Sequence, residues 1–242
     1  MSEQLTALLE RNRIWACDVE AAEPGFFESL CGQQAPDYLW IGCADSRVPA
    51  NELVDLRPGQ LFVHRNIANV VSPSDLNCLS CLQYAVDVLR VKHIMVVGHS
   101  GCGGVHAALN GSRIGIADNW ILHVRDVMER HASRLRAIPE SRRIDLACEL
   151  NVLEQARNVS RTTVVQDAWK RGQPLTIHGW VYALENGLIN SIEFDVDDAG
   201  MVQSAYSNSL SNVWARHARS DMQRSELRES LFVNQSEPGD IR

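Results

Sequence analysis

The chain has 242 residues, of which 45% are hydrophobic and 22% are charged, and a formal net charge of −7; such values are typical of a soluble globular protein with a sizeable core. The negative charge disfavours nucleic acid and anionic membrane surfaces as partners, so a bound anion has to be held by a local cluster. Because there is no run of 18 apolar residues and the N-terminal segment is amphipathic and unlike a signal peptide, we expect a cytoplasmic protein without a membrane span.

The first half of the chain alternates between predicted helices and apolar strands. Helical spacing of apolar residues predicts helices at about 3–16, 24–32 and 74–91. Short apolar runs bounded by turn residues predict strands at 38–43, 60–66 and 93–99. The run at 93–99 is almost continuously apolar, which is typical of a parallel strand covered on both faces.

The second half begins with a helical block and ends with a hairpin. The block is expected at about 118–136, 141–158 and 160–172, followed by strands at 175–184 and 187–197. Asn186-Gly187 between these strands is a strong hairpin signal. The order predicts an α/β fold with a central, mostly parallel β-sheet, flanking helices and an antiparallel edge strand. We expect one domain over residues 1–210 and a polar C-terminal extension over 211–242.

Three metal-ligand side chains follow the ends of two predicted strands. Cys43 ends the strand at 38–43, His99 ends the strand at 93–99, and Cys102 follows in a glycine-rich turn. Ligands gather at the carboxyl ends of strands in open parallel sheets, so these three side chains are expected to meet. Two thiolates and an imidazole suit Zn²⁺, and three protein ligands leave the fourth tetrahedral position open, as in catalytic sites.

The sequence resembles the β-class carbonic anhydrases over residues 5–210. The motifs that carry the resemblance, in family order, are CADSRVP, LFVHRNIAN, LQYAVDVL, VVGHSGCGG and HGWVY. The resemblance implies a zinc lyase that hydrates carbon dioxide reversibly to bicarbonate and a proton. It implies one Zn²⁺ per chain on Cys43, His99 and Cys102. It also implies a homodimer or homotetramer, in which an N-terminal helical arm wraps over the partner.

The resemblance gives Asp45 and Arg47 two states beside the metal. Paired with Arg47, Asp45 stays ionised and orients the attacking water. Released from Arg47, Asp45 becomes a fourth zinc ligand and closes the site. A bacterial subset of the family has this switch, governed by a non-catalytic bicarbonate pocket. The residues at the matching positions here are Trp40, Arg65 and Tyr182, with Val48 placed to transmit the displacement.

Two other functions are compatible with these motifs. A relative of the family hydrolyses carbon disulfide with the same ligand set, so the ligands do not exclude that substrate. The second alternative is a non-catalytic protein whose zinc only stabilises an interface or takes part in sensing an anion. Asp45 and Arg47 argue against it, because a structural zinc site needs no gating carboxylate.

Overall fold

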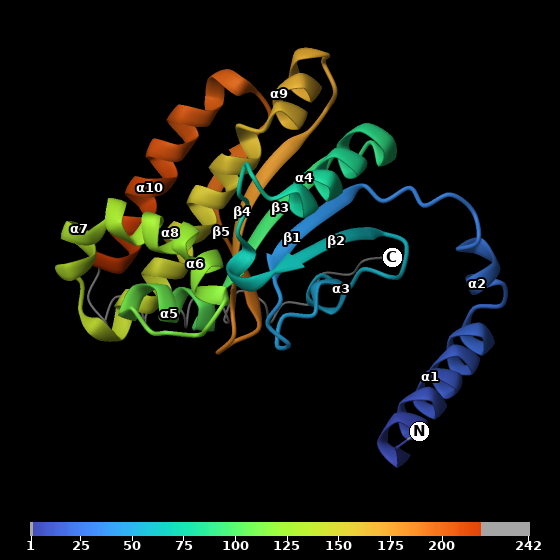
Figure 1. The fold of residues 1–242 in the computed structure, drawn as a ribbon. Coiled ribbons are helices and arrows are strands. Elements are labelled where there is room, and N and C mark those ends of the chain that lie inside the picture. Colours follow the sequence, from blue (N-terminus) through green and yellow to red (C-terminus); the bar gives the residue numbers. More distant parts are fainter. Residues whose placement is uncertain (1, 219–242) are drawn as a thin grey trace, which may run out of the picture.

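The structure is a computed structural model in which residues 2–218 are described. Five strands form one sheet in the order β2-β1-β3-β4-β5 (Figure 1). Their bounds are β1 (Tyr38–Cys43), β2 (Leu61–Asn66), β3 (His93–His99), β4 (Thr176–Ala183) and β5 (Leu188–Val196). Neighbouring strands are parallel except β4 and β5, which are antiparallel. The predicted fold class, including the antiparallel edge strand, is confirmed.

Helices flank the sheet and account for most of the rest of the described chain. They are α1 (Glu3–Ala22), α2 (Phe26–Ser29), α3 (Ala50–Leu53), α4 (Leu76–Gln83), α5 (Gly103–Asn110), α6 (Ala117–Arg130), α7 (Ala132–Arg136), α8 (Glu140–Ser160), α9 (Thr163–Lys170) and α10 (Val202–Ala218). Shorter turns are η1 (Ile67–Asn69), the π-helical η2 (Tyr84–Leu89) and η3 (Ala199–Met201). Within residues 2–218, no helix has the length and apolarity needed to span a bilayer.

The main core lies between the sheet and helix α8. Every residue of α8 from 150 to 156 is buried, so this helix is covered on all sides and not only along one stripe. Its polar residues Asn151, Glu154 and Gln155 therefore need partners inside the protein. The opposite face of the sheet holds a smaller cluster in which Trp40, Val48 and Val97 are buried. Successive strand residues alternate between these two faces.

The largest difference from the sequence prediction is α10, where a polar extension was expected to begin. Serine and asparagine dominate residues 203–212, which hides the helix, but Val213 and Trp214 are buried in the main core. The domain boundary predicted at residue 210 falls inside this helix; the remainder of the predicted extension, 219–242, lies outside the described residues. The helix expected over 118–136 is also interrupted, at His131 between α6 and α7.

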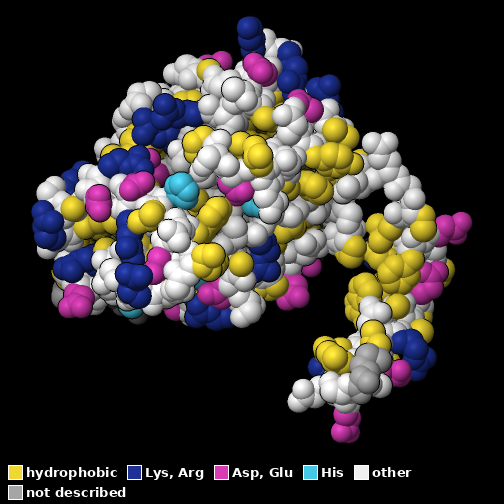
Figure 2. Space-filling view, in the orientation of Figure 1, with side chains coloured by type: hydrophobic (Ala, Val, Ile, Leu, Met, Phe, Trp, Pro, Cys, Tyr) yellow, Lys and Arg dark blue, Asp and Glu magenta, His cyan; other side chains and the backbone are white. Residues whose placement is uncertain are grey.

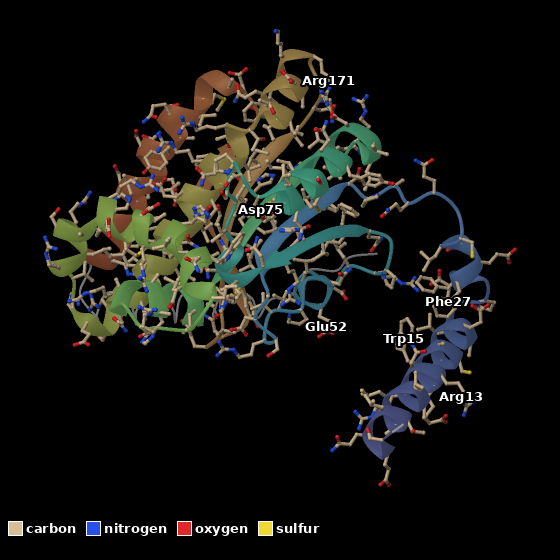
Figure 3. The ribbon with its side chains drawn as sticks, viewed as in Figure 1. Arg13, Trp15, Phe27, Glu52, Asp75 and Arg171 are labelled. Atoms are coloured by element: carbon tan, nitrogen blue, oxygen red, sulfur yellow. The ribbon has the colours of Figure 1, made fainter. Side chains whose placement is uncertain are left out.

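Helices α1 and α2 form an N-terminal helical arm that stands apart from the sheet (Figure 1). Trp15 of α1 packs edge to face on Phe27 of α2, with ring centroids 5.7 Å apart (Figure 3). Helix α1 has no buried residue, and hydrophobic side chains lie along the arm's surface (Figure 2). They include Leu5, Leu8, Leu9 and Ile14. The arm itself is confirmed, and its contact with a partner stays a prediction.

Candidate metal centre

Cys43, His99 and Cys102 come together at the carboxyl ends of two adjacent parallel strands. Cys43 is the last residue of β1 and His99 the last of β3, and Cys102 is the N-cap of α5. One ligand atom from each lies within 4.8 Å of the others, and all three side chains are buried. The convergence predicted from the strand ends is therefore observed.

One ring nitrogen of His99, Nε2, faces the two thiols without a hydrogen-bond partner of its own. Its Nδ1 lies 3.0 Å from the carbonyl oxygen of Ser100, so Nδ1 carries the proton and Nε2 keeps a lone pair. Nε2 is buried and has no hydrogen-bond partner among the described residues. A buried polar atom without a partner needs an explanation, and a metal ion supplies one here.

The two thiols have the separation and the ionisation that zinc requires. Their sulfur atoms are 3.9 Å apart, against about 3.8 Å for two Zn–S bonds of about 2.3 Å at a tetrahedral angle. Hydrogen bonding with the Cys102 thiol outweighs burial and lowers the pKa of Cys43 to about 4. The same contact, with burial, raises the pKa of Cys102. The metal-free pair thus shares one proton, and a zinc ion that binds both thiolates releases it.

Asp45 lies beside this donor set and is held by Arg47. Its two carboxylate oxygens accept hydrogen bonds from Arg47 Nε at 2.9 Å and Nη2 at 2.7 Å. The Arg47 guanidinium holds the pKa of Asp45 well below its usual range. Oδ2 of Asp45 is 3.7 Å from Nε2 of His99. An ionised carboxylate therefore borders the metal position while it remains paired with Arg47.

Comparisons with known proteins agree with this site. A model of the carbonic anhydrase family matches residues 38–189. A carbonic anhydrase of Emericella nidulans is 46% identical over 78% of this chain and 83% of its own length. The chain belongs to the β-class carbonic anhydrase family.

Two solved structures of β-carbonic anhydrases have the same fold. A tetrameric enzyme from Sordaria macrospora superposes with a TM-score of 0.77 at 38% identity, covering 81% of this chain and all of the other. An enzyme from Coccomyxa, solved with acetazolamide, gives a TM-score of 0.80 at 38% identity and covers 98% of this chain and all of its own. The family resemblance inferred from the motifs is confirmed.

The sequence did not reveal how this carbonic anhydrase holds the loop beside Cys43. Ala68 in that loop has a left-handed backbone with φ of 62°, and its backbone helps to lower the pKa of Cys43. Asn151 of α8 fixes this turn by donating from Nδ2 to the Ala68 carbonyl at 2.8 Å. Asn151 is a positioning residue 83 positions away from Ala68, and no local motif indicates the contact.

The four residues predicted for a bicarbonate pocket lie on β1, β2, β4 and the loop that follows β1. Trp40, Val48 and Tyr182 belong to the cluster on the sheet face opposite α8, Trp40 and Val48 being buried and Tyr182 packed against them. Arg65 lies at the end of β2 and donates from Nε to the Cys43 carbonyl at 2.8 Å. Its Nη2 donates to the Asp45 carbonyl at 2.5 Å.

A second group of metal-ligand residues lies elsewhere, but two of its three residues have hydrogen-bond partners within the protein. His64, Asp75 and Cys78 each place one such atom within 4.8 Å of the others. Asp75 caps α4 by accepting a hydrogen bond from the Asn77 N–H at 3.0 Å. His64 Nε2 lies 3.3 Å from Asn66 Nδ2. Unlike the site at His99, this group has no buried imidazole nitrogen that lacks a hydrogen-bond partner among the described residues.

Proposed function

We propose that the chain catalyses the reversible hydration of carbon dioxide on a zinc ion held by Cys43, His99 and Cys102. The observation that carries the proposal is the unpartnered Nε2 of His99 facing two thiols 3.9 Å apart. Zinc in such a site would lower the pKa of a coordinated water and so make that water a nucleophile, although two thiolate ligands should leave this pKa above that of a three-histidine zinc site. Carbon dioxide is apolar and needs no charged anchor.

The chain's own contribution to the reaction lies with Asp45 and Arg47. The paired carboxylate keeps its charge, accepts a hydrogen bond from the attacking water and turns the water's lone pair toward carbon dioxide. Arg47 fixes the carboxylate through two hydrogen bonds. The Asp45–Arg47 pair favours a catalytic zinc site over a zinc site that only stabilises the structure.

The test is metal content and carbon dioxide hydration measured on the same purified protein. We expect one zinc per chain, and we expect Cys43→Ala, His99→Ala and Cys102→Ala to lose both zinc and activity. Cys81→Ala is the matched control because this thiol lies outside the site, and it should keep both. Wild-type protein without stoichiometric zinc, or ligand variants with full turnover, would contradict the proposal. Turnover of carbon disulfide without carbon dioxide hydration would assign the other substrate.

We further propose that bicarbonate regulates the enzyme by moving Asp45 from Arg47 onto zinc. The buried Nε1 of Trp40 has no hydrogen-bond partner among the described residues, which leaves a donor for a small oxyanion. Val48 is 1% exposed and its N–H donates to the Asp45 carbonyl at 3.1 Å. An anion that displaces Val48 would therefore pull on the turn that carries Asp45.

The regulatory proposal predicts a loss of bicarbonate inhibition without a loss of zinc. Trp40→Phe and Tyr182→Phe each remove one donor, so both variants should be less inhibited by bicarbonate and respond less cooperatively to pH. Trp180→Phe is the control, because Trp180 packs in the same cluster and is not part of the proposed pocket. Unchanged bicarbonate inhibition in both Trp40→Phe and Tyr182→Phe would contradict the proposal.

We also propose that the chain works as a homodimer or homotetramer. The exposed apolar side chains of the N-terminal helical arm support it, and the Sordaria relative is described as tetrameric. Light scattering on the purified protein measures the mass directly. A monomer at micromolar concentration would refute this proposal. The cytoplasmic location stays a prediction.

A further inference from the structure

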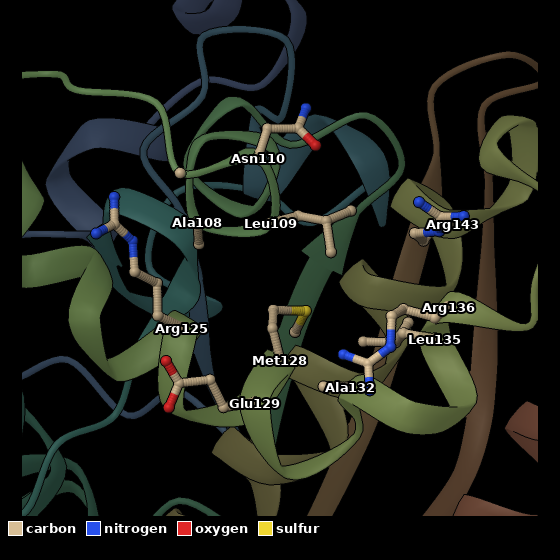
Figure 4. Close-up of a pocket in the computed structure, with 11 residues that line it drawn as sticks. Ala108, Leu109, Asn110, Arg125, Met128, Glu129, Ala132, Leu135, Arg136 and Arg143 are labelled. Atoms are coloured by element: carbon tan, nitrogen blue, oxygen red, sulfur yellow. The ribbon is translucent and has the colours of Figure 1, made fainter.

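A cavity of about 400 Å³ lies away from the residues of the metal centre (Figure 4). It opens to solvent and is lined by the end of α5, the second half of α6, α7 and the start of α8. Leu109, Met128 and Leu135 give it an apolar lining, with Met128 and Leu135 themselves buried. The volume falls in the range of small-molecule sites.

Four charged side chains also line this cavity. Arg136 and Arg143 lie on one side of it, Arg125 and Glu129 lie on the other, and Met128 lies between them (Figure 4). Three guanidinium groups and one carboxylate give the cavity a local charge of about +2 on a chain whose net charge is −7. Local positive charge of this kind attracts anions in spite of the overall charge.

The three cavity arginines form no salt bridge in the described part of the chain, in contrast with arginines nearby, although Arg125 lies close enough to Asp118 to help lower the pKa of that carboxyl. Arg113 pairs with Asp118 at 2.8 Å and Arg130 pairs with Glu154 at 2.9 Å. No carboxylate oxygen of residues 2–218 lies within 4.0 Å of a guanidinium nitrogen of the cavity. Their charge is therefore available to a ligand.

Two of these arginines are already held in place by backbone carbonyls. Arg125 donates from Nη2 to the Ser112 carbonyl at 3.2 Å, and Arg143 donates from Nη2 to the Ile138 carbonyl at 3.1 Å. Their Nε atoms are buried and have no hydrogen-bond partner among the described residues. A fixed guanidinium loses less conformational freedom when it binds an anion, which favours a preformed site.

We propose that this cavity binds a small organic dianion, a dicarboxylate or a phosphate monoester with an apolar body. The two negative charges match the local charge of the cavity, and planar guanidinium groups bind carboxylate and phosphate oxygens through paired hydrogen bonds. The apolar body covers Leu109, Met128 and Leu135. Bicarbonate does not fit this description, because it would leave the apolar lining uncovered and supply one charge.

The test is calorimetric titration of the full-length, zinc-loaded protein with a matched series of probes. Phthalate carries two carboxylates on a ring, benzoate carries one, and benzamide carries none. Phenyl phosphate adds the phosphate monoester. We expect phthalate, phenyl phosphate or both to bind at one site per chain, at least tenfold more tightly than benzoate, and benzamide not to bind. Binding should weaken as salt rises, since the Debye length falls to about 3 Å at 1 M.

Arginine variants locate the probe. Arg136→Gln is the first variant, because this exposed side chain makes no hydrogen bond or salt bridge within residues 2–218 whose loss could unfold the protein. It should weaken binding of the dianion about tenfold, as expected for a charge-assisted hydrogen bond. Arg143→Gln should do the same. Arg161→Gln, an exposed arginine at the end of α8, is the control and should bind like wild type.

Three results would overturn this proposal. The first is no binding of either dianion at millimolar concentration. The second is benzamide binding as tightly as phthalate, which would make the cavity a purely apolar site. The third is wild-type affinity in both Arg136→Gln and Arg143→Gln, which would place the anion elsewhere, for example on zinc. Since binding is measured and not turnover, these outcomes are independent of the proposed hydration activity.

Discussion

Replacing Asn151 by alanine should weaken zinc binding from a position outside the ligand set. Asn151 is fully buried in α8 and donates to the Ala68 carbonyl at 2.8 Å. It also accepts a hydrogen bond from Gln155 Nε2 at 3.0 Å. Ala68 has a left-handed backbone, and its backbone contributes to the lowered pKa of Cys43. The variant therefore frees the turn that lies beside the candidate ligand Cys43.

The expected size of the effect follows from these contacts. A buried carbonyl left without its donor costs about 1–3 kcal/mol, and the space left by the truncated side chain adds about 1 kcal/mol. The free energy of unfolding should therefore fall by about 2–4 kcal/mol. Loss of a group that orients a metal ligand typically lowers metal affinity about 10-fold to 100-fold.

The assay pairs urea unfolding with zinc affinity measured by competition with a chelator. Asn158→Ala is the matched control: Asn158 lies two turns further along α8 and donates to the Val71 carbonyl at 3.0 Å, outside the turn at Ala68. Both variants should lose stability, and only Asn151→Ala should lose zinc affinity by tenfold or more. Equal zinc affinities in the two variants would show that Asn151 has a purely structural role.

Three more outcomes are expected. Gly42→Ala should abolish bicarbonate inhibition while zinc stays bound, because the new Cβ would lie 2.2 Å from Trp40 Nε1; inhibition kinetics with metal analysis measure both. Glu154→Gln should lower the free energy of unfolding by about 1.5–3 kcal/mol at neutral pH, as expected for the loss of a hydrogen bond to a charged group. Burial raises the pKa of Glu154, but its hydrogen bonds and neighbouring arginines lower it overall, so the wild-type advantage should be present above pH of about 4.5 and shrink as pH falls below it in urea titrations. A chelator should lower the thermal midpoint, since ligand at a thousandfold excess over Kd stabilises the fold by about 4 kcal/mol; an unchanged midpoint would mean that zinc does not bind the folded state preferentially.

The sequence was sufficient for the strands and for the convergence of the candidate metal ligands. The runs at 38–43 and 93–99 were predicted with the bounds that β1 and β3 have, because buried parallel strands carry continuous apolar runs. Parallel pairing of these two strands then brings Cys43 and His99 to one edge of the sheet. Ligand convergence follows from topology alone and needs no knowledge of side-chain packing.

Elements that depend on long-range packing were not predictable in the same way. Helix α10 is polar over most of its length and is stabilised by the contacts of a few residues such as Trp214 with the core. The support of Ala68 by Asn151 joins positions 83 residues apart. In both cases the decisive interaction is tertiary, so it overrides or adds to what local propensity indicates.

Strand β1 gives a physical reason why the metal centre and the proposed bicarbonate pocket should be coupled. Side chains alternate along a strand, so Trp40 faces the pocket and Cys43, three residues on, belongs to the core on the other face. Arg65 donates to the carbonyls of both Cys43 and Asp45. An anion that recruits the Arg65 guanidinium would compete for the same N–H groups that bind the backbone of Cys43 and Asp45. Direct competition at one guanidinium can therefore carry the regulation, and no relay through distant residues is required.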